Sequence, residues 1–295
     1  DEVVEVEVLS IVHSPETGPI SLRSRDPFAG GPARFCDLAH IGTHVAPDRR
    51  AHWHSLDAGT MNLFRLVGDM SHLASFLVLL LKLLASRSAA GASSRNEPRL
   101  FPPPLTLAGI SLKSQELFFF VFVTRYLDLF THFVSLYNST MKVLFLAFSG
   151  AIVYVMRYRE PFRSTYDRSH DTFLHIKFAV LPCALLALIF NESFEVMEIL
   201  WTFSIYLEAV AIIPQLILLQ RHGEVENLTG NYVVLLGAYR GCYILNWIYR
   251  AATEKSYHFI WLMFIAGMVQ TALYVDFFYY YAISKYHGKK MTLPA

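Results

Sequence analysis

The chain has 295 residues, of which 54% are hydrophobic, 15% are aromatic and only 17% are charged. A soluble domain usually has about a quarter charged residues, and the deficit here begins after residue 60, so the composition predicts a membrane protein. The formal net charge of +1 gives no excess of positive charge to attract phosphates, which argues against a nucleic-acid-binding protein.

Residues 1–60 differ from the rest of the chain. They contain nine acidic and five basic residues and no long apolar run. Four histidines suggest a metal site, but no periodic helix or strand presents them together: His40, His44, His52 and His54. We therefore interpret the segment as a disordered extension without function, of the kind that an upstream translation or a gene-model error adds. The three cysteines also lack the spacing of metal ligands, and we expect neither a metal nor a cofactor.

Beyond Met61, apolar runs recur at lengths near the ~20 residues that cross a bilayer as a helix. We expect an all-α polytopic protein with seven transmembrane helices, at residues 65–85, 116–136, 140–157, 174–190, 198–219, 232–249 and 258–284. The first loop contains three consecutive prolines and cannot be helical throughout, so residues 92–109 are interpreted as an atypical insert. Residues 285–295 form the expected tail.

The loops alternate in their content of lysine and arginine. The basic side is formed by the loops after the first and third spans and by the tail: Lys82, Arg87, Arg95, Arg99, Lys113, Arg157, Arg159, Arg163, Arg168, Lys285, Lys289 and Lys290. The opposite loops hold few basic residues. Because basic loops stay in the cytosol, we expect a luminal amino terminus and a cytosolic carboxyl terminus.

Polar residues recur inside the spans, where a charge usually faces a wet cavity or a partner. Helical spacing places them on shared faces of four spans: Arg65, Asp69 and His72; Arg125 and Asp128; Glu198, Trp201 and Glu208; and Tyr239, Arg240, Tyr243, Asn246, Trp247 and Arg250. Two interpretations fit. The arginines and carboxylates can pair with one another and fix the packing of the helices. Alternatively, the arginines form a pocket for an acidic ligand from the lumen, because the planar guanidinium suits carboxylates. The excess of arginine near the luminal ends favours the pocket.

Several segments resemble those of one receptor family. They are MNLFRLVGDMSHL (61–73), RYLDLF (125–130), NSTMKV (138–143), TYDRSHDTF (165–173), EILWTFSIYLEAVAIIPQL (198–216), YR (239–240), NWIYR (246–250), AGMVQTALYVDFFYYY (266–281) and the tail HGKKMTLPA (287–295). On these segments, residues 61–295 resemble the KDEL receptor family. The extension 1–60, the insert 92–109, His132 and a longer loop after Arg250 depart from the pattern.

The resemblance implies a fold and a function. The fold is two three-helix bundles joined by a linking helix, as in SWEET and PQ-loop transporters, with Pro214–Gln215 as the PQ signature. The function is capture of escaped endoplasmic-reticulum residents in the acidic Golgi through their C-terminal Lys-Asp-Glu-Leu or His-Asp-Glu-Leu signal. The receptor returns them in coatomer-coated vesicles and releases them at neutral pH. It would reside in the membranes of the endoplasmic reticulum, the cis-Golgi and the vesicles between them.

The resemblance also assigns residues to roles. Signal binding would involve Arg65, Arg125, Tyr126, Asp128, His132, Glu198, Trp201, Tyr239, Arg240, Tyr243, Asn246, Trp247 and Arg250. Within this set, Arg65, Arg125 and Arg250 would hold the carboxylates of the ligand, and Asp128 and Glu198 would receive its basic residue. His72, Glu208 and Tyr239 would sense pH, and Asp276, Lys289 and Lys290 would serve transport and coat recruitment.

Three other classes of protein fit the sequence less well. A small-solute transporter of the same fold would use a site at the membrane midplane, whereas the polar groups here gather toward the luminal ends. A G-protein-coupled receptor lacks support because the acidic-Arg-aromatic triplet of its third span is missing. An enzyme is not expected, because no nucleophile–base pair or metal cluster is apparent in the sequence.

Overall fold

The computed structural model describes most of the chain from Met61 onward, namely residues 61–93, 109–131, 133–160, 162–166, 168–255, 257 and 259–294. The predicted extension 1–60, nearly all of the Pro-rich insert 92–109 and the candidate binding residue His132 lie outside these residues.

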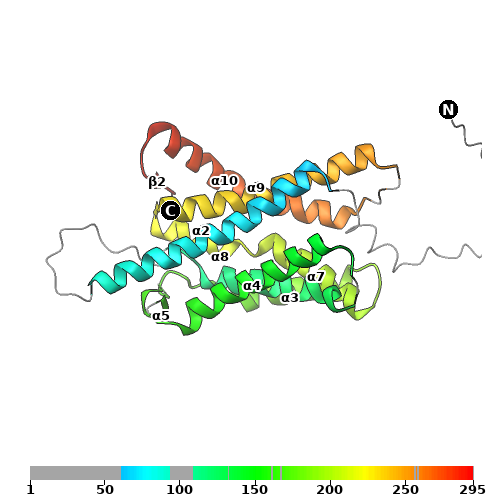
Figure 1. The fold of residues 1–295 in the computed structure, drawn as a ribbon, viewed down its shortest axis with the longest axis horizontal. Helices are drawn as coiled ribbons and strands as arrows, with labels where there is room; N and C mark the ends of the chain where they lie inside the picture. Colours follow the sequence, from blue (N-terminus) through cyan, green and yellow to red (C-terminus); the bar gives the residue numbers. More distant parts are fainter. Residues whose placement is uncertain are drawn as a thin grey trace, which may run out of the picture. The chain divides into compact units, whose positions relative to one another are not determined.

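The described residues are almost entirely helical (Figure 1). The α-helices are α2 (Leu63–Ser93), α3 (Leu112–Arg125), α4 (Leu136–Tyr158), α5 (Phe162–Thr165), α6 (Leu181–Ile189), α7 (Val196–Val210), α8 (Ile213–His222), α9 (Asn227–Thr253) and α10 (Trp261–His287). A 3₁₀ turn, η1 (Tyr126–Phe130), follows α3, and a π-turn, η2 (Ile176–Val180), precedes α6. Two short strands, β1 (Glu224–Val225) and β2 (Met291–Thr292), pair antiparallel.

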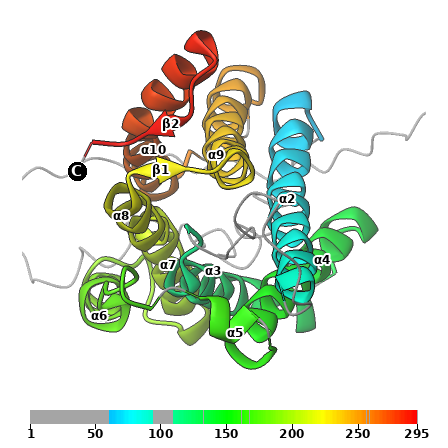
Figure 2. The same cartoon turned by 90° about the vertical axis from the view of Figure 1, so that its left-hand side faces the viewer.

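The long helices follow one another around a ring, which Figure 2 shows from its end. Each helix contacts the next in the order α2, α9, α10, α7, α3 and α4, and α4 returns to α2. Helix α6 packs on α7. Helices α2 and α9 run antiparallel, since Asn62 hydrogen-bonds Asn246 at one end and Lys82 pairs with Glu226 at the other.

Four helical stretches among the described residues are long and apolar enough to cross a membrane: Leu63–Ser86, Leu136–Tyr158, Val196–His222 and Trp261–His287. Ile176–Ile189 is a shorter apolar helix. Large apolar side chains are exposed on these elements, among them Leu81, Ile189 and Trp261, as expected where the surrounding solvent is lipid. The protein is therefore a polytopic helical membrane protein, as the composition predicted.

The structure corrects the predicted ends of several spans. The predicted span 116–136 ends as an α-helix at Arg125, tightens into η1 and then leaves helical geometry. Ser135 then starts the next helix by accepting a hydrogen bond of 3.2 Å from the backbone N–H of Asn138. Helix α9 extends beyond both ends of the expected span 232–249, and α10 extends beyond the carboxyl-terminal end of the expected span 258–284.

Prolines lie inside two other predicted spans. The span 198–219 breaks between α7 and α8 just before Pro214, which has no N–H for the preceding turn and clashes with its carbonyl. Pro182 likewise lies at the junction of η2 and α6. Directly after Pro214, Gln215 binds the start of α3: its Oε1 accepts from Ser111 N–H at 2.9 Å, and its Nε2 donates to the Gly109 carbonyl at 2.6 Å. The Pro–Gln pair therefore ends one helix and fastens the next to α3.

Lys82, which we counted among the loop charges, lies inside α2. Its side chain is 1% exposed, and its Nζ is 2.8 Å from Glu226 Oε2 and 2.5 Å from Thr229 Oγ1. A buried ammonium requires such partners, because burial removes its hydration. The residue therefore joins α2 to α9 and carries no information about loop charge.

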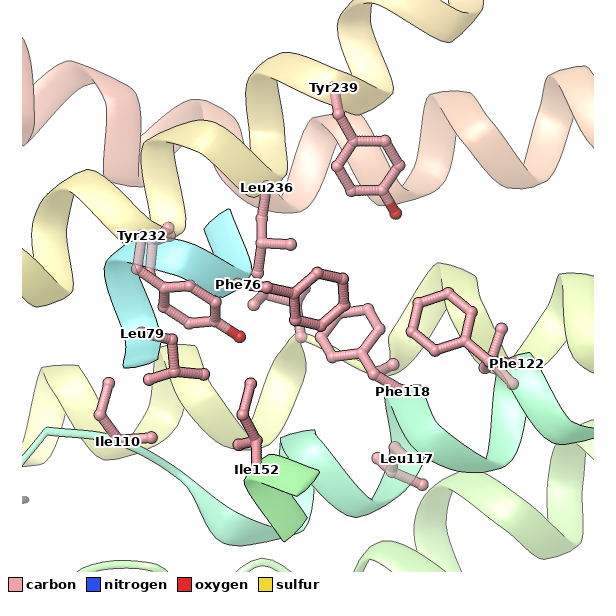
Figure 3. Packing of buried hydrophobic residues seen from close by; sticks show 14 of the residues in the cluster. Phe76, Leu79, Ile110, Leu117, Phe118, Phe122, Ile152, Tyr232, Leu236 and Tyr239 are labelled. Carbon is pink, nitrogen blue, oxygen red and sulfur yellow. The ribbon is translucent and has the colours of Figure 1, made fainter. Parts of the chain in front are cut away.

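The apolar core lies where α2, α3, α4 and α9 meet (Figure 3). Phe76 and Leu79 from α2 pack with Phe122 from α3, Ile152 from α4 and Leu236 from α9. This core lies beside the polar groups described next, and it excludes water from one side of them.

Candidate functional site

Glu208 of α7 lies at the centre of a buried ion cluster. Its Oε2 atom pairs with Nη1 of Arg125 from α3 and lies 2.9 Å from Nη2 of Arg240 from α9. Its Oε1 atom accepts a 2.7 Å hydrogen bond from the hydroxyl of Tyr239. Glu208 is only 3% exposed. One carboxylate thus neutralises two guanidinium groups from different helices, at a buried position where few water molecules can solvate these charges.

His72 connects α2 to this cluster through its ring. It stacks on Tyr239 with the ring centroids 4.1 Å apart and the planes inclined by 3°. Phe76, Phe122 and Phe145 surround the other sides of the imidazole. The three residues predicted to sense pH, His72, Glu208 and Tyr239, therefore form one continuous group.

Arg240 extends the cluster to α10. Its Nε donates to Oε1 of Gln270, and Gln270 Nε2 approaches the Tyr239 hydroxyl at 3.5 Å. The guanidinium carbon lies 5.8 Å from the ring centroid of Tyr239 and 5.9 Å from that of Trp247. The Arg240 guanidinium is therefore bound by groups of the protein itself.

Asp69 of α2 forms a second buried cluster. Its Oδ2 accepts a 2.7 Å hydrogen bond from the hydroxyl of Tyr137 on α4, and its Oδ1 accepts one from Tyr243 on α9. Nearby, Asn62 donates to Asn246 at 2.5 Å. These bonds place Tyr243 and Asn246, two predicted binding residues, against the first turns of α2.

Two further ion pairs lie at the same end of the ring. Lys142 Nζ is 2.6 Å from Asp128 Oδ2. Arg250, whose side chain is 7% exposed, places both Nε and Nη2 3.0 Å from Oε2 of Glu254. The ring of Tyr257 lies beside the Arg250 guanidinium, with its centroid 4.5 Å from Cζ.

Glu198 is the most deeply buried of the predicted acceptors for a cation. It is 3% exposed, and its Oε1 accepts a 3.1 Å hydrogen bond from Thr202 Oγ1 one turn along α7. Trp201 on the same helix is half-buried and packs beside Ile205 and Ala266. The predicted polar face of α7, with Glu198, Trp201 and Glu208, therefore points into the protein.

Three buried polar atoms at this site have no hydrogen-bond partner among the described residues: Arg125 Nη2, Asp128 Oδ1 and Glu198 Oε2. Buried polar groups are hydrogen-bonded in most structures, so such atoms indicate where a ligand or water binds. One is a cationic donor and two are anionic acceptors. The arrangement therefore suits a ligand that carries charges of both signs.

Two further predicted binding residues are Arg65 and Tyr126. Arg65 is half-buried in the first turns of α2. The ring of Tyr126 stacks on Phe122 with a centroid distance of 5.6 Å, and Lys142 Nζ lies 5.8 Å from its centroid.

The residues assigned to transport lie apart from the ion clusters. Asp276 lines a cavity of about 270 Å³ with Ile213, Phe277 and Leu293. Lys290 on the tail lies 3.3 Å from Glu224, and both side chains are largely exposed. A further cavity of about 550 Å³ between α2, α4 and α5 contains none of the predicted residues.

Comparisons with known proteins identify the family. A family profile described as "ER lumen protein retaining receptor" matches residues 106–250. The chain is 56% identical over 236 residues to "ER lumen protein-retaining receptor" of Petunia hybrida, which covers 80% of this chain and all of the relative. "ER lumen protein-retaining receptor A" of Arabidopsis thaliana is 57% identical over the same shares of both chains. "ER lumen protein-retaining receptor 2" of Homo sapiens is 49% identical over 235 residues, again over its whole length.

The chain belongs to the ER lumen protein-retaining receptor family. This confirms the predicted resemblance to KDEL receptors, and it confirms that the protein is not an enzyme. The profile of the ER lumen protein-retaining receptor family ends at Arg250, one helical turn before Glu254, whose side chain binds Arg250 in this structure.

Several residues of the site were not predicted: Tyr137, Lys142, Ser204, Glu254, Tyr257 and Gln270. Most of them contact a partner on another element, whereas Glu254 lies four residues after Arg250, at the end of the same helix. Gln270 and Ser204 are polar residues inside apolar helices, and that signal alone could have identified them. Tyr257 lies in the loop that departs from the family pattern, and no feature of the sequence indicates its contact with Arg250.

Proposed function

We propose that this protein is a receptor for the C-terminal retention signal of soluble endoplasmic-reticulum proteins, Lys-Asp-Glu-Leu or His-Asp-Glu-Leu. The proposal rests on one structural observation, a buried guanidinium nitrogen and two buried carboxylate oxygens that have no hydrogen-bond partner among the described residues. Such a tetrapeptide carries one cation and three carboxylates, counting its chain terminus, and charged groups of opposite sign bind it best. The names of relatives with 49–57% identity agree with this function.

Each end of the ligand has suitable partners. Arg65, Arg125 and Arg250 receive the carboxylates of the signal, and Asp128 and Glu198 receive its basic residue. In support, Arg125 and Arg250 each bind a carboxylate of the protein in this structure. Tyr126, Trp201, Asn246 and Trp247 shape the walls, and Tyr243 and Arg240 fix α9, which carries Asn246, Trp247 and Arg250. His132 completes the predicted set.

Binding is coupled to acid pH through His72. Its imidazole lies between the aromatic core and the charged groups of three helices, Glu208 on α7, Arg125 on α3, and Arg240 with Tyr239 on α9. Insertion of a ligand carboxylate beside Arg125 adds negative charge to this cluster, and uptake of a proton by His72 offsets it. Affinity is then greatest in the acidic Golgi and falls at the neutral pH of the endoplasmic reticulum.

The membrane arrangement extends the four apolar stretches to seven spans by adding α3, η2 with α6, and α9. Helices α2–α4 form one bundle and α7/α8, α9 and α10 form the other, with α6 as the linking helix, which agrees with the packing of α6 on α7. The amino-terminal end of α2 faces the lumen and the tail faces the cytosol. Residues 61–295 suffice for binding, and residues 1–60 are dispensable.

The cytosolic side recruits the coatomer coat for retrograde transport. Lys289 and Lys290 are exposed beside α10, where a cytosolic protein can reach them. Asp276 of α10 lines a cavity with residues of α8 and with Leu293 of the tail, so it is placed to relay a movement of α10 to the lysines.

A retention assay tests the proposal. Cells depleted of their own receptors would express the full chain or residues 61–295, together with a secreted reporter that ends in Lys-Asp-Glu-Leu. Both forms should keep the reporter inside the cell, and a reporter without the signal should be secreted. Equal secretion of the two reporters would contradict the function. Retention by the full chain alone would contradict only the dispensability of residues 1–60.

A further inference from the structure

The carboxylate of Glu254 binds the guanidinium of Arg250 in this structure. Both Nε and Nη2 of Arg250 lie 3.0 Å from the same carboxylate oxygen, Oε2. The Arg250 side chain is 7% exposed, whereas that of Glu254 is 25% exposed. A pair between two solvated side chains on a helix is weak because water competes for both. Here the cation is buried and only the carboxylate reaches solvent, so Glu254 is a principal neutralising group for this cation.

The position of Glu254 in the chain allows its side chain to leave. Glu254 is the C-cap residue of α9, with extended backbone angles of φ −98° and ψ 109°. Its backbone N–H makes the last bond of the helix, to the Arg250 carbonyl at 2.8 Å, and its carbonyl accepts from Tyr257 N–H at 3.1 Å. The backbone is thus fixed at both ends of the residue. The carboxylate can rotate toward solvent without unwinding a turn of α9.

Arg250 cannot follow such a movement. Its guanidinium is buried and lies against the ring of Tyr257, with 4.5 Å between Cζ and the ring centroid. If Glu254 rotates away, a buried cation remains without this carboxylate, which is unfavourable until another anion arrives. The most favourable exchange is therefore carboxylate for carboxylate.

We infer that Glu254 is an internal competitor that makes Arg250 selective for a ligand carboxylate. The inference rests on the proposed function, since it assigns the displaced position to the C-terminal carboxylate of the retention signal. An internal competitor lowers the apparent affinity by the fraction of time for which it occupies the site. It also excludes neutral peptide ends, because a neutral group cannot replace the charge that Glu254 provides.

Binding of two peptides to the purified full chain tests the inference. One peptide ends in Lys-Asp-Glu-Leu with a free carboxylate, and the other has the same sequence with an amidated terminus. The variant Glu254→Gln keeps the size of the side chain and removes its charge. The matched control is Glu160→Gln, which removes an exposed carboxylate just after α4 and leaves the Arg250–Glu254 pair intact. Size-exclusion profiles of all proteins verify that they remain folded.

We expect Glu254→Gln to bind the free-acid peptide about 3- to 10-fold more tightly than wild type, which corresponds to occupancy of Arg250 by Glu254 for most of the time. The amidated peptide should gain less than about twofold, and Glu160→Gln should change neither peptide by more than about twofold, because loss of a distant exposed charge acts only through screened electrostatics.

The outcomes separate this inference from the function on which it rests. If wild type binds the free-acid peptide but Glu254→Gln binds it no more tightly, the competitor role is overturned and the proposed function stands. An equal gain for the amidated peptide also overturns the role, because the exchange would then not involve the terminal carboxylate. If no protein binds either peptide, the proposed function fails, and this inference fails with it.

Discussion

The imidazole of His72 on α2 lies parallel to the phenol ring of Tyr239 on α9, with 4.1 Å between the ring centroids. Tyr239 in turn donates its hydroxyl to Glu208, the carboxylate that neutralises Arg125 and Arg240. His72 is therefore connected to the arginines through one aromatic contact and one hydrogen bond.

The substitution His72→Phe tests this connection. A phenyl ring preserves the stacking on Tyr239 within an aromatic surrounding but cannot bind a proton. Because the ligand-bound state is proposed to take up one proton at His72, wild-type affinity should fall by up to about tenfold per pH unit as pH rises from about 5.5 to 7.4. The variant should bind with a flat profile. A peptide titration at several pH values measures both slopes, and equal slopes would remove His72 from the mechanism.

Glu208→Gln should destabilise the protein strongly. The amide cannot neutralise Arg125 and Arg240, and removal of one partner of a buried ion pair typically costs about 3–5 kcal/mol. The control is Glu224→Gln, since Glu224 pairs with Lys290 and the two side chains are 67% and 82% exposed. Loss of an exposed pair should cost no more than about 1 kcal/mol. Thermal unfolding of the purified proteins compares the two, and equal midpoints would show that the cluster does not support the fold.

Arg125→Lys should weaken binding of the signal peptide. Arg125 Nε donates to Ser204 at 3.0 Å and Nη1 pairs with Glu208, which leaves Nη2 for the ligand. A lysine has one ammonium group in place of this planar fork, so it cannot hold Glu208 and a ligand carboxylate in the same geometry. We expect a loss of roughly 2–4 kcal/mol in binding free energy. Arg157→Ala, an exposed arginine near the far end of α4, should leave the affinity unchanged.

The contact between α9 and α10 depends on Gly237. A Cβ atom at this position would lie 2.5 Å from Phe278 Cζ and 3.1 Å from Tyr274 Cδ1. Gly237→Ala should therefore destabilise the protein by about 1–3 kcal/mol through overpacking. One helical turn later, a Cβ at Gly241 would have no neighbour within 4 Å. Gly241→Ala should stabilise α9 by about 0.5–1 kcal/mol. Thermal unfolding should move in opposite directions for the two variants, and a shift in the same direction would contradict the packing.

The sequence predicted the class of protein and the helical faces that carry the polar residues, but it did not predict which residues pair. Arg65, Asp69 and His72 share a face by spacing alone, since helical periodicity places them there. That Asp69 binds Tyr137 and Tyr243 depends on how three helices approach one another, which spacing along one helix does not determine.

The interpretation that the arginines pair internally also has support in the structure, because Arg125, Arg240 and Arg250 all bind carboxylates. Internal pairing and ligand binding are compatible, since Arg125 keeps an atom without a hydrogen-bond partner among the described residues. The break in the predicted span 198–219 before Pro214 could have been predicted, because proline has no N–H to continue a helix.

The central claim is that buried arginines recognise the carboxylates of a C-terminal signal. Isothermal titration of the purified protein at about pH 5.5 tests it most directly, with a Lys-Asp-Glu-Leu peptide that carries either a free or an amidated terminus. The free acid should bind at least about 100-fold more tightly than the amidated peptide, since loss of a buried ion pair is worth roughly 3 kcal/mol or more. Equal affinity for the two peptides, or binding of neither, would contradict it.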